Sequence, residues 1–192
     1  TLFKVKQYDR NELTLFFKGI AGCGKSTLVN AIEMFFPSHL IGMTGSNMSD
    51  KYGMSEMVGK AICVCREVSK EFKMPQEEWQ VAVSGEGGEY NIKFKSPVRI
   101  DPWIAPFVWA GNAGPENYDD RMGQVSRRTA CFEMSRPVTR RDGAIMDKIR
   151  GNSGALLRRM TLAYFELVRL YGTIDVMSLP GCMPPAMYAS YR

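Results

Sequence analysis

The sequence predicts an α/β fold in which a central parallel sheet is flanked by helices. A glycine-rich loop joins an apolar run to a helical segment within residues 13–36, and further short apolar runs alternate with polar or helical segments. One of these runs, residues 61–65, is apolar throughout, as is typical of a strand buried on both faces. The 192 residues are enough for one such domain with a substantial core.

Four strands and two long helices are expected. The strands cover residues 13–17, 61–65, 106–110 and 129–134. One helix covers residues 26–36, and the other, residues 154–171, has apolar residues at every third or fourth position. We expect this second, amphipathic helix to face the core. Residues 1–135 are then the α/β core, and residues 136–192 a helical extension of the same domain.

An inserted β-hairpin is expected between the second and third strands. Residues 84–88 read SGEGG, and polar and apolar residues alternate from Tyr90 to Lys95. On a strand, this alternation places Lys93 and Lys95 on one face and Phe94 on the other. Two cations on one face suit a phosphate backbone, although a solvated strand face explains them equally well.

The composition is that of a soluble globular protein. Hydrophobic residues make up 45% and charged residues 23%, and no apolar run approaches the roughly 20 residues that a membrane span needs, so no membrane partner is expected. The net charge of +5 allows a nucleic-acid partner but also fits an ordinary basic surface. Because the chain begins at Thr1 and ends shortly after a proline-rich stretch, we expect it to be a fragment of a longer polypeptide.

The cysteine and histidine content excludes two kinds of site. The five cysteines show no paired CxxC spacing and the single histidine is His39, so neither a zinc finger nor a histidine-based catalytic site is supported. We expect reduced thiols and an intracellular protein. Cys63 and Cys65 alternate within an expected strand, which favours small buried residues on one face over a redox pair.

The glycine-rich loop has the pattern of a phosphate-binding loop. Its nine residues are Gly19, Ile20, Ala21, Gly22, Cys23, Gly24, Lys25, Ser26 and Thr27. The glycines let successive backbone N–H groups turn inward around an anion, and the following helix adds the positive end of its dipole. The lysine suits the β- and γ-phosphates and the serine hydroxyl suits Mg²⁺. The loop therefore predicts a nucleoside triphosphate, ATP, with Mg²⁺.

Two polar residues at the ends of later strands predict hydrolysis of that nucleotide. Glu67 follows the apolar run 61–65, at the place where a carboxylate can polarise the attacking water and contact Mg²⁺. Asn112 follows the strand 106–110, where a neutral amide can reach a γ-phosphate or the water without adding negative charge. The alternatives are an ordinary exposed glutamate and an Asx turn.

Five motifs in this order resemble superfamily 3 helicases, a branch of the AAA+ P-loop NTPases found mainly in DNA viruses. The motifs are GIAGCGKST, AICVCRE, SGEGGEYNIKFKSP, PFVWAGN and SRRTACFEM, and the resemblance spans about residues 13–135. It is strongest for the helicase-primase family of poxviruses and other large DNA viruses, and parvovirus replication-protein helicase domains have a similar layout.

The resemblance implies roles for individual residues. Lys25 and Ser26 match the lysine and hydroxyl of the phosphate loop, Glu67 the last acidic residue of the second motif, and Asn112 the polar residue at the end of the motif PFVWAGN. Arg66 departs from the acidic pair usual in the second motif, which puts metal binding by that pair in doubt; Mg²⁺ then depends mainly on Ser26, phosphate and water.

Further residues match the parts that act on DNA and between subunits. Lys93 and Lys95 match a hairpin that projects into the central pore of a ring and touches DNA. Arg128 matches an arginine finger supplied to a neighbouring subunit, and Arg127 could share or exchange that role. The resemblance thus implies a homo-oligomeric ring, a hexamer.

The activity implied is that of a replicative DNA helicase motor moving 3′ to 5′ on single-stranded DNA. A fused or associated primase and a viral replication site in the host cytoplasm or nucleus belong to the same resemblance. Two alternatives stay open: another P-loop ATPase, such as a packaging motor or kinase, and a nucleotide-binding ring that loads onto DNA with weak turnover. The preserved set of site residues argues against the second.

Overall fold

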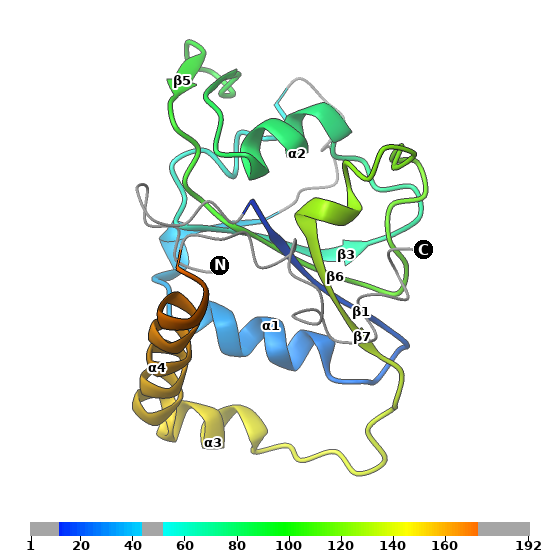
Figure 1. Ribbon diagram of the computed structural model, residues 1–192, viewed down its shortest axis with the longest axis vertical. Coiled ribbons are helices and arrows are strands. Elements are labelled where there is room, and N and C mark those ends of the chain that lie inside the picture. The colour runs from blue at the N-terminus through cyan, green and yellow to red at the C-terminus, as the bar shows by residue number, and fades with distance from the viewer. Residues whose placement is uncertain (1–11, 44–51, 173–192) are drawn as a thin grey trace.

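One parallel sheet organises the part of the chain that the computed structural model describes, residues 12–43 and 52–172 (Figure 1). Its five strands lie in the order β2-β3-β6-β1-β7, and each neighbouring pair is parallel. They are β1 (Thr14–Gly19), β2 (Ile41–Met43), β3 (Ile62–Val68), β6 (Phe107–Gly111) and β7 (Thr129–Met134). The predicted α/β class with a central parallel sheet is confirmed. The strand β2 was not predicted, because its three residues are too few for a sequence pattern.

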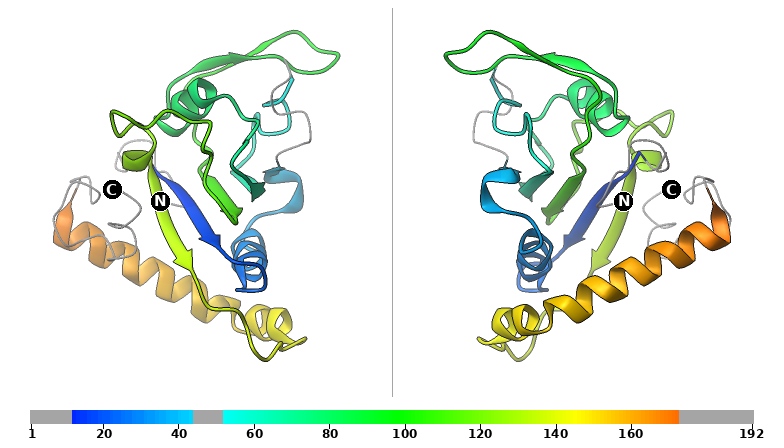
Figure 2. Two further views of the ribbon diagram at one scale, coloured as in Figure 1. Left: turned by 90° about the vertical axis from the view of Figure 1, so that its right-hand side faces the viewer. Right: turned by 90° about the vertical axis from the view of Figure 1, so that its left-hand side faces the viewer.

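Helices cover both faces of the sheet (Figures 1 and 2). On one face, α1 (Lys25–Glu33) buries Val29 against Ile62, Val64 and Val108 of the strands. On the other face, α2 (Gln76–Val83) lies over an aromatic core. Since successive side chains of a strand point to opposite faces, burial on both sides explains the continuous apolar runs in the sequence.

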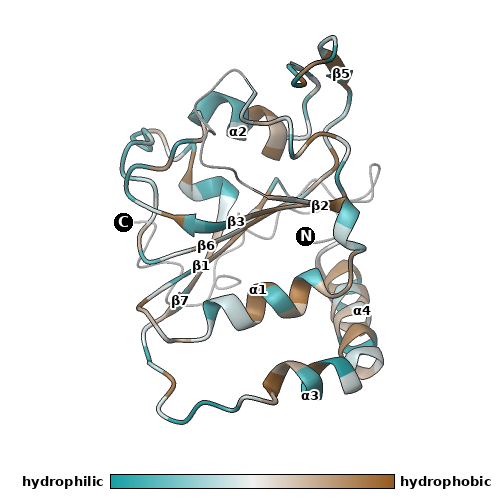
Figure 3. Cartoon of the chain, turned by 180° about the vertical axis from the view of Figure 1, so that it is seen from behind, coloured by the Kyte–Doolittle hydropathy of each residue, from teal (hydrophilic) through white to brown (hydrophobic). Residues whose placement is uncertain are grey.

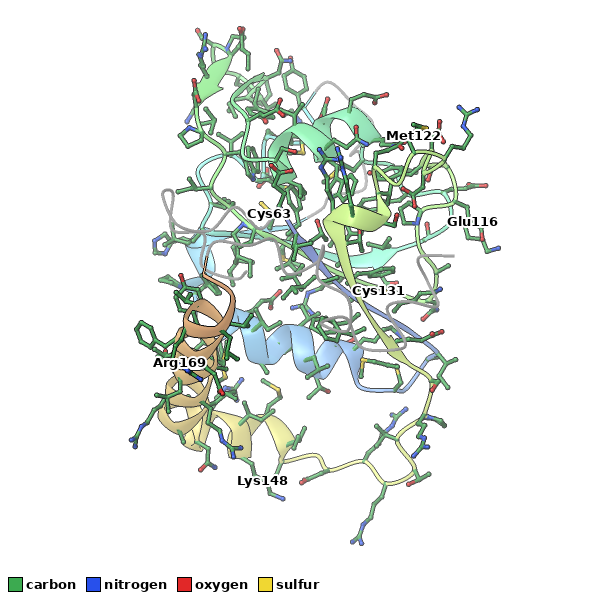
Figure 4. All side chains as sticks on the ribbon, viewed as in Figure 1. Cys63, Glu116, Met122, Cys131, Lys148 and Arg169 are labelled. Carbon is green, nitrogen blue, oxygen red and sulfur yellow. The ribbon has the colours of Figure 1, made fainter. Side chains whose placement is uncertain are left out.

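The core under α2 is built around two tryptophans. The rings of Trp79 and Trp109 lie 5.0 Å apart between centroids, and the Trp79 Nε1–H donates to Thr14 Oγ1 at 3.0 Å. Cys63 and Cys65 are fully buried in the same core, and Cys63 lies inside the molecule at the sheet (Figure 4). Burial raises the pKa of the Cys63 thiol. The interpretation of both cysteines as small core residues is confirmed.

The inserted hairpin is present, but its strands lie elsewhere than predicted. It pairs β4 (Gly88–Tyr90) with β5 (Val98–Ile100) in a separate antiparallel sheet. Residues 91–97 form the connection, and the Lys95 N–H donates to the Ile92 carbonyl at 3.1 Å across a turn. The expectation that Lys93 and Lys95 share a strand face is therefore wrong. Alternation over six residues cannot distinguish a strand from a turn between two shorter strands.

Two helices follow β7 on the α1 side of the sheet (Figure 2). They are α3 (Ile145–Gly151), which was not predicted, and α4 (Ser153–Tyr171), which was. The expectation that α4 faces the core is wrong, because no described residue of α4 is buried. Figure 3 colours several stretches of α4 as hydrophobic. The exposed apolar residues of α4 include Leu157, Leu162, Phe165, Leu167, Val168 and Leu170. No helix in the described ranges is long and apolar enough to cross a membrane.

Candidate active site

The predicted phosphate loop leaves the carboxyl end of β1, which lies between β6 and β7. The chain crosses to one side of β1 for β2, β3 and β6 and to the other side for β7, and such a switch point is where open α/β sheets bind ligands. Backbone geometry explains the glycines. Gly22 and Gly24 have φ values of 75° and 96°, and a Cβ on Gly19 would lie 2.2 Å from the Met134 carbonyl oxygen.

The Lys25 ammonium joins this loop to the neighbouring strand. Its Nζ donates to the carbonyl oxygens of Gly19 and Ile20, both at 2.7 Å, and to Asn112 Oδ1 at 3.0 Å. All three acceptors are uncharged, so the ammonium lies beside the loop without a carboxylate partner in these contacts. Two residues 87 positions apart in the sequence therefore meet at one edge of the sheet.

Asn112 is placed by a close approach of two strands. It directly follows β6, and its neighbour Gly111 is paired with Val68 of β3 and with Lys18 of β1. A Cβ on Gly111 would lie 2.0 Å from the Val68 carbonyl oxygen, so only glycine fits there. The predicted polar residue Asn112 thus reaches the phosphate loop, as its contact with Lys25 shows.

Glu67 lies at the carboxyl end of β3, on the same sheet edge as the phosphate loop. The pairing of β3 with β6 shifts register between Cys65 and Val68, so Glu67 falls in an irregular end of the strand. Its side chain is exposed, and no hydrogen bond or ion pair places it against Lys25 or Asn112. The parallel sheet accounts for its position at this edge, because all carboxyl ends meet there.

Arg66, the residue that departs from the motif, pairs with a carboxylate on α1. Its Nη2 forms a short ion pair with Glu33 Oε2, and the two side chains are 32% and 16% exposed. Glu33 Oε1 is buried without a hydrogen-bond partner in the described chain. Arg66 therefore ties the end of α1 to β3 beside Glu67, a structural contact that an acidic residue at this position could not make.

Removing Arg66 should destabilise the fold, because it leaves the half-buried Glu33 carboxylate without its counterion. We expect Arg66→Ala to lower the free energy of unfolding by about 1–2 kcal/mol, measured by urea denaturation. Arg121→Ala is the matched control, since the Arg121–Asp119 pair is exposed to solvent and its loss should leave the free energy of unfolding almost unchanged. Equal effects of both variants would contradict a structural role for the Arg66–Glu33 pair.

The residues available to a metal ion are few. No group of three or more His, Cys, Asp or Glu side chains within residues 12–43 and 52–172 could hold one. Ser26, exposed in the first turn of α1, and Glu67 are oxygen donors on the edge that carries the phosphate loop. This donor set fits Mg²⁺, a hard cation that is bound by one or two protein oxygens together with substrate phosphates and water.

The predicted finger residues lie at the opposite edge of the sheet within this chain. Thr129 at the start of β7 pairs with Thr14, whereas Met134 at its end pairs with Gly19 of the phosphate loop. Arg128, just before β7, donates from Nη2 to Ser84 Oγ at 3.0 Å and from Nη1 to the Gln124 carbonyl at 3.1 Å. Its side chain is 12% exposed, while Arg127 is exposed.

The segment after β7 reaches the phosphate loop, which the sequence reasoning missed. The Val138 N–H donates to the Gly22 carbonyl at 2.9 Å, and the exposed Arg136 lies two residues before it. Residues 136–141 are all exposed. The signal was available, because a strand paired in parallel with β1 must deliver its following residues to the same edge.

The two predicted DNA-contacting lysines lie away from this site. Lys93 and Lys95 are exposed in the hairpin connection, which extends from the body of the molecule beyond α2 (Figure 1). Between them stands Phe94, with its side chain 93% exposed. The structure thus separates the predicted phosphate loop from a basic projection.

Comparison with known proteins gives a likeness of fold. The A form apo structure of the NrS-1 C-terminal region matches with a TM-score of 0.57 and 19% identity, over 75% of this chain and 35% of that chain. An apo structure of NrS-1 residues 305–718 matches with a TM-score of 0.54, the same identity and the same coverage. The JCV helicase bound to a thiazolopyridine acetamide compound matches with a TM-score of 0.48 and 12% identity, over 95% of this chain and 50% of that chain.

No protein-family model matches the sequence, and no curated protein does. The chain spans about a third of the length of the NrS-1 chains that it matches. The residues described here therefore share the fold of part of the NrS-1 C-terminal region.

Proposed function

We propose that this chain is the ATP-hydrolysing motor domain of a DNA helicase of superfamily 3, within the AAA+ P-loop NTPases. The observation that carries the proposal is the contact of Lys25 with Asn112, which joins the phosphate loop to the end of the neighbouring strand. A loop that only bound an anion has no need of a polar residue from β6. A hydrolysis site needs one, because the γ-phosphate and the attacking water lie beyond the loop.

Each site residue has a task in this proposal. The N–H groups of the phosphate loop bind the polyphosphate of ATP, and Lys25 exchanges its neutral acceptors for the β- and γ-phosphate oxygens. Glu67 polarises the attacking water, and Asn112 orients the γ-phosphate or that water. Ser26 and Glu67 hold Mg²⁺, which neutralises charge on the phosphate oxygens when bound.

In this proposal, a neighbouring subunit of a homo-oligomeric ring supplies an arginine finger to the ATP site. We propose that the ring is a hexamer. Arg128 and Arg127 remain candidates for this finger, although Arg128 must exchange its contacts with Ser84 and Gln124 to act. Arg136 is a further candidate, because the exposed segment after β7 lies against the phosphate loop.

Mixing two inactive variants tests the shared site. Arg128→Ala and Glu67→Gln should each be nearly inactive alone, since an arginine finger contributes on the order of 10³- to 10⁵-fold to the rate. Mixed rings should regain part of the ATPase activity, because some interfaces then combine two intact halves. An Arg136→Ala variant identifies which arginine acts: the finger is the arginine whose alanine variant is inactive alone and regains activity when mixed with Glu67→Gln, and a variant that is active alone does not remove the finger.

The proposed output is movement along single-stranded DNA, 3′ to 5′, driven through the hairpin lysines. Lys93 and Lys95 are exposed on a projection and have no carboxylate partner among the ion pairs of the described chain. The proposal extends to a fused or associated primase and a viral replication site in the host cytoplasm or nucleus. These parts rest on the sequence resemblance alone.

The decisive experiment measures ATP hydrolysis by the chain with and without single-stranded DNA. A helicase motor should hydrolyse ATP faster when the strand is present, and Lys25→Ala should strongly lower the rate both with and without the strand. Hydrolysis that is insensitive to the strand would favour another P-loop ATPase. Nucleotide binding without turnover would favour a loading platform.

The hairpin lysines should set the salt dependence of strand binding. Replacing both Lys93 and Lys95 with alanine removes two phosphate contacts, so the slope of log K against log salt should become less negative by about 1.4, at about 0.7 per contact on a single strand. Fluorescence anisotropy at several salt concentrations measures the slope. An unchanged slope would show that other residues contact the phosphates.

A further inference from the structure

The tip of the hairpin exposes an aromatic ring in an unfavourable backbone conformation. Phe94 is 93% exposed, more than any other large hydrophobic residue in the described ranges. Its φ of 62° is the one positive value of a non-glycine residue there. The Lys95 N–H···Ile92 carbonyl bond closes a turn in which Phe94 holds the third position. With a positive φ at that position alone, the turn is of type II, where glycine is the favoured residue.

Phe94 therefore combines an exposed apolar ring with a strained backbone, and the contacts given for the described residues do not offset either cost. An exposed phenylalanine ring gains nothing from burial, and a left-handed phenylalanine is strained. Among residues 12–43 and 52–172, the ring contact of Phe94 is with its neighbour, since Lys93 Nζ lies 5.4 Å from the ring centroid. Glycine at this position would avoid both costs, so the ring has a use outside the folded domain.

The charges around the ring indicate the kind of partner. Residues 91–97 carry two lysines and no acidic side chain. An aromatic ring between cations matches a strand with an anionic backbone and flat, apolar base faces. Those faces are accessible in an unpaired strand and covered by stacking in a duplex. An apolar groove on another protein would require both ammonium groups beside the ring to lose water at the same contact.

We infer that Phe94 stacks on an unpaired base of a single-stranded nucleic acid while Lys93 and Lys95 contact the phosphates on either side. The inference rests on the proposed function and adds a component of strand affinity that does not depend on salt. The inference also gives the strained backbone of Phe94 a role in binding, because the left-handed conformation keeps the ring at the tip of the hairpin. Every base has a stacking face, so the contact is tolerant of sequence.

The test compares two strands of equal length, oligo(dT) and an abasic strand with the same phosphates. Phe94→Ala should weaken oligo(dT) binding about tenfold, within the range of one aromatic-base stack, and leave its salt slope unchanged. Binding of the abasic strand should not change. Phe94→Trp should retain oligo(dT) affinity, and oligo(U) should show the same dependence on Phe94, because both strands present base faces.

Matched variants separate binding from folding. Phe94→Gly should bind oligo(dT) as weakly as Phe94→Ala, yet keep a Tm at or above that of the wild type, because glycine adopts a positive φ freely. Met122→Ala removes an 87% exposed apolar side chain on another outer loop (Figure 4) and should change neither measurement.

The possible failures can be told apart. A wild-type chain that neither hydrolyses ATP nor binds oligo(dT) would overturn the proposed function. Wild-type binding that is equally strong with Phe94→Ala, or an equal loss on both strands, would overturn the stacking role alone. A lower Tm in Phe94→Gly would show that the ring stabilises the fold, and this result would also overturn the stacking role.

Discussion

Replacing Lys25 with alanine is expected to lower the rate of ATP hydrolysis by about 10²- to 10³-fold, the loss typical of one charged or hydrogen-bonding group that stabilises a transition state. The ammonium already lies against the loop carbonyls of Gly19 and Ile20 and against Asn112. It therefore needs little rearrangement to meet a polyphosphate. Its removal also frees Asn112 from its observed contact, so both groups are affected by one change.

Two further variants make this prediction specific. Lys60→Ala removes a lysine that bonds the His39 carbonyl at 2.8 Å and should leave the rate unchanged. Asn112→Ala should keep nucleotide binding but slow turnover, because Lys25 retains its two loop contacts. Steady-state ATPase assays and titration with a fluorescent ATP analogue measure both quantities. Full activity in Lys25→Ala would remove the basis for a phosphate-loop enzyme.

Trp79→Ala is expected to lower the free energy of unfolding by about 3–5 kcal/mol, as for other large aromatic residues removed from a packed core. Trp79 is completely buried, and its ring packs on Trp109 and Tyr118 with centroids 5.0 and 5.6 Å away. Truncation also removes the partner of the Thr14 hydroxyl, which is itself buried. A loss of this size is a large part of the stability of most domains.

Urea denaturation followed by circular dichroism measures this loss, and α4 offers the control. Phe165 is 61% exposed on that helix, so Phe165→Ala should change the free energy of unfolding by less than about 0.5 kcal/mol. A similar loss in both variants would mean that α4 packs against the domain in solution. Comparable m values are needed for the comparison, because the two variants must expose the same surface on unfolding.

The parts of the fold that follow from local pattern were predictable. Residues 61–65 are apolar because β3 is buried on both faces. The loop from Gly19 to Lys25 contains glycines because positive φ values and a close approach to Met134 require them. Asn112 could be assigned for the same reason. Parallel strands deliver their carboxyl-terminal residues to one edge, so a polar residue after such a strand is a candidate for the site.

What could not be predicted depends on partners distant in the sequence. Arg66 fits no local rule, because its partner Glu33 lies on α1. The apolar positions of α4 correctly predict a helix, but they do not show which part of the molecule, if any, covers its apolar face. The sequence pattern predicts a strand where the structure has a turn around Phe94, since the period-two signal covers few residues and a left-handed phenylalanine has no signature in sequence.

The hydrogen bond from Val138 to Gly22 has a mechanical consequence. It fastens the chain that leads into α3 and α4 to the middle of the phosphate loop. A loop that adjusts its backbone around a ligand must either break this bond or pull residue 138 along. The bond therefore couples the backbone position of Gly22 to that of the segment leading to α3 and α4.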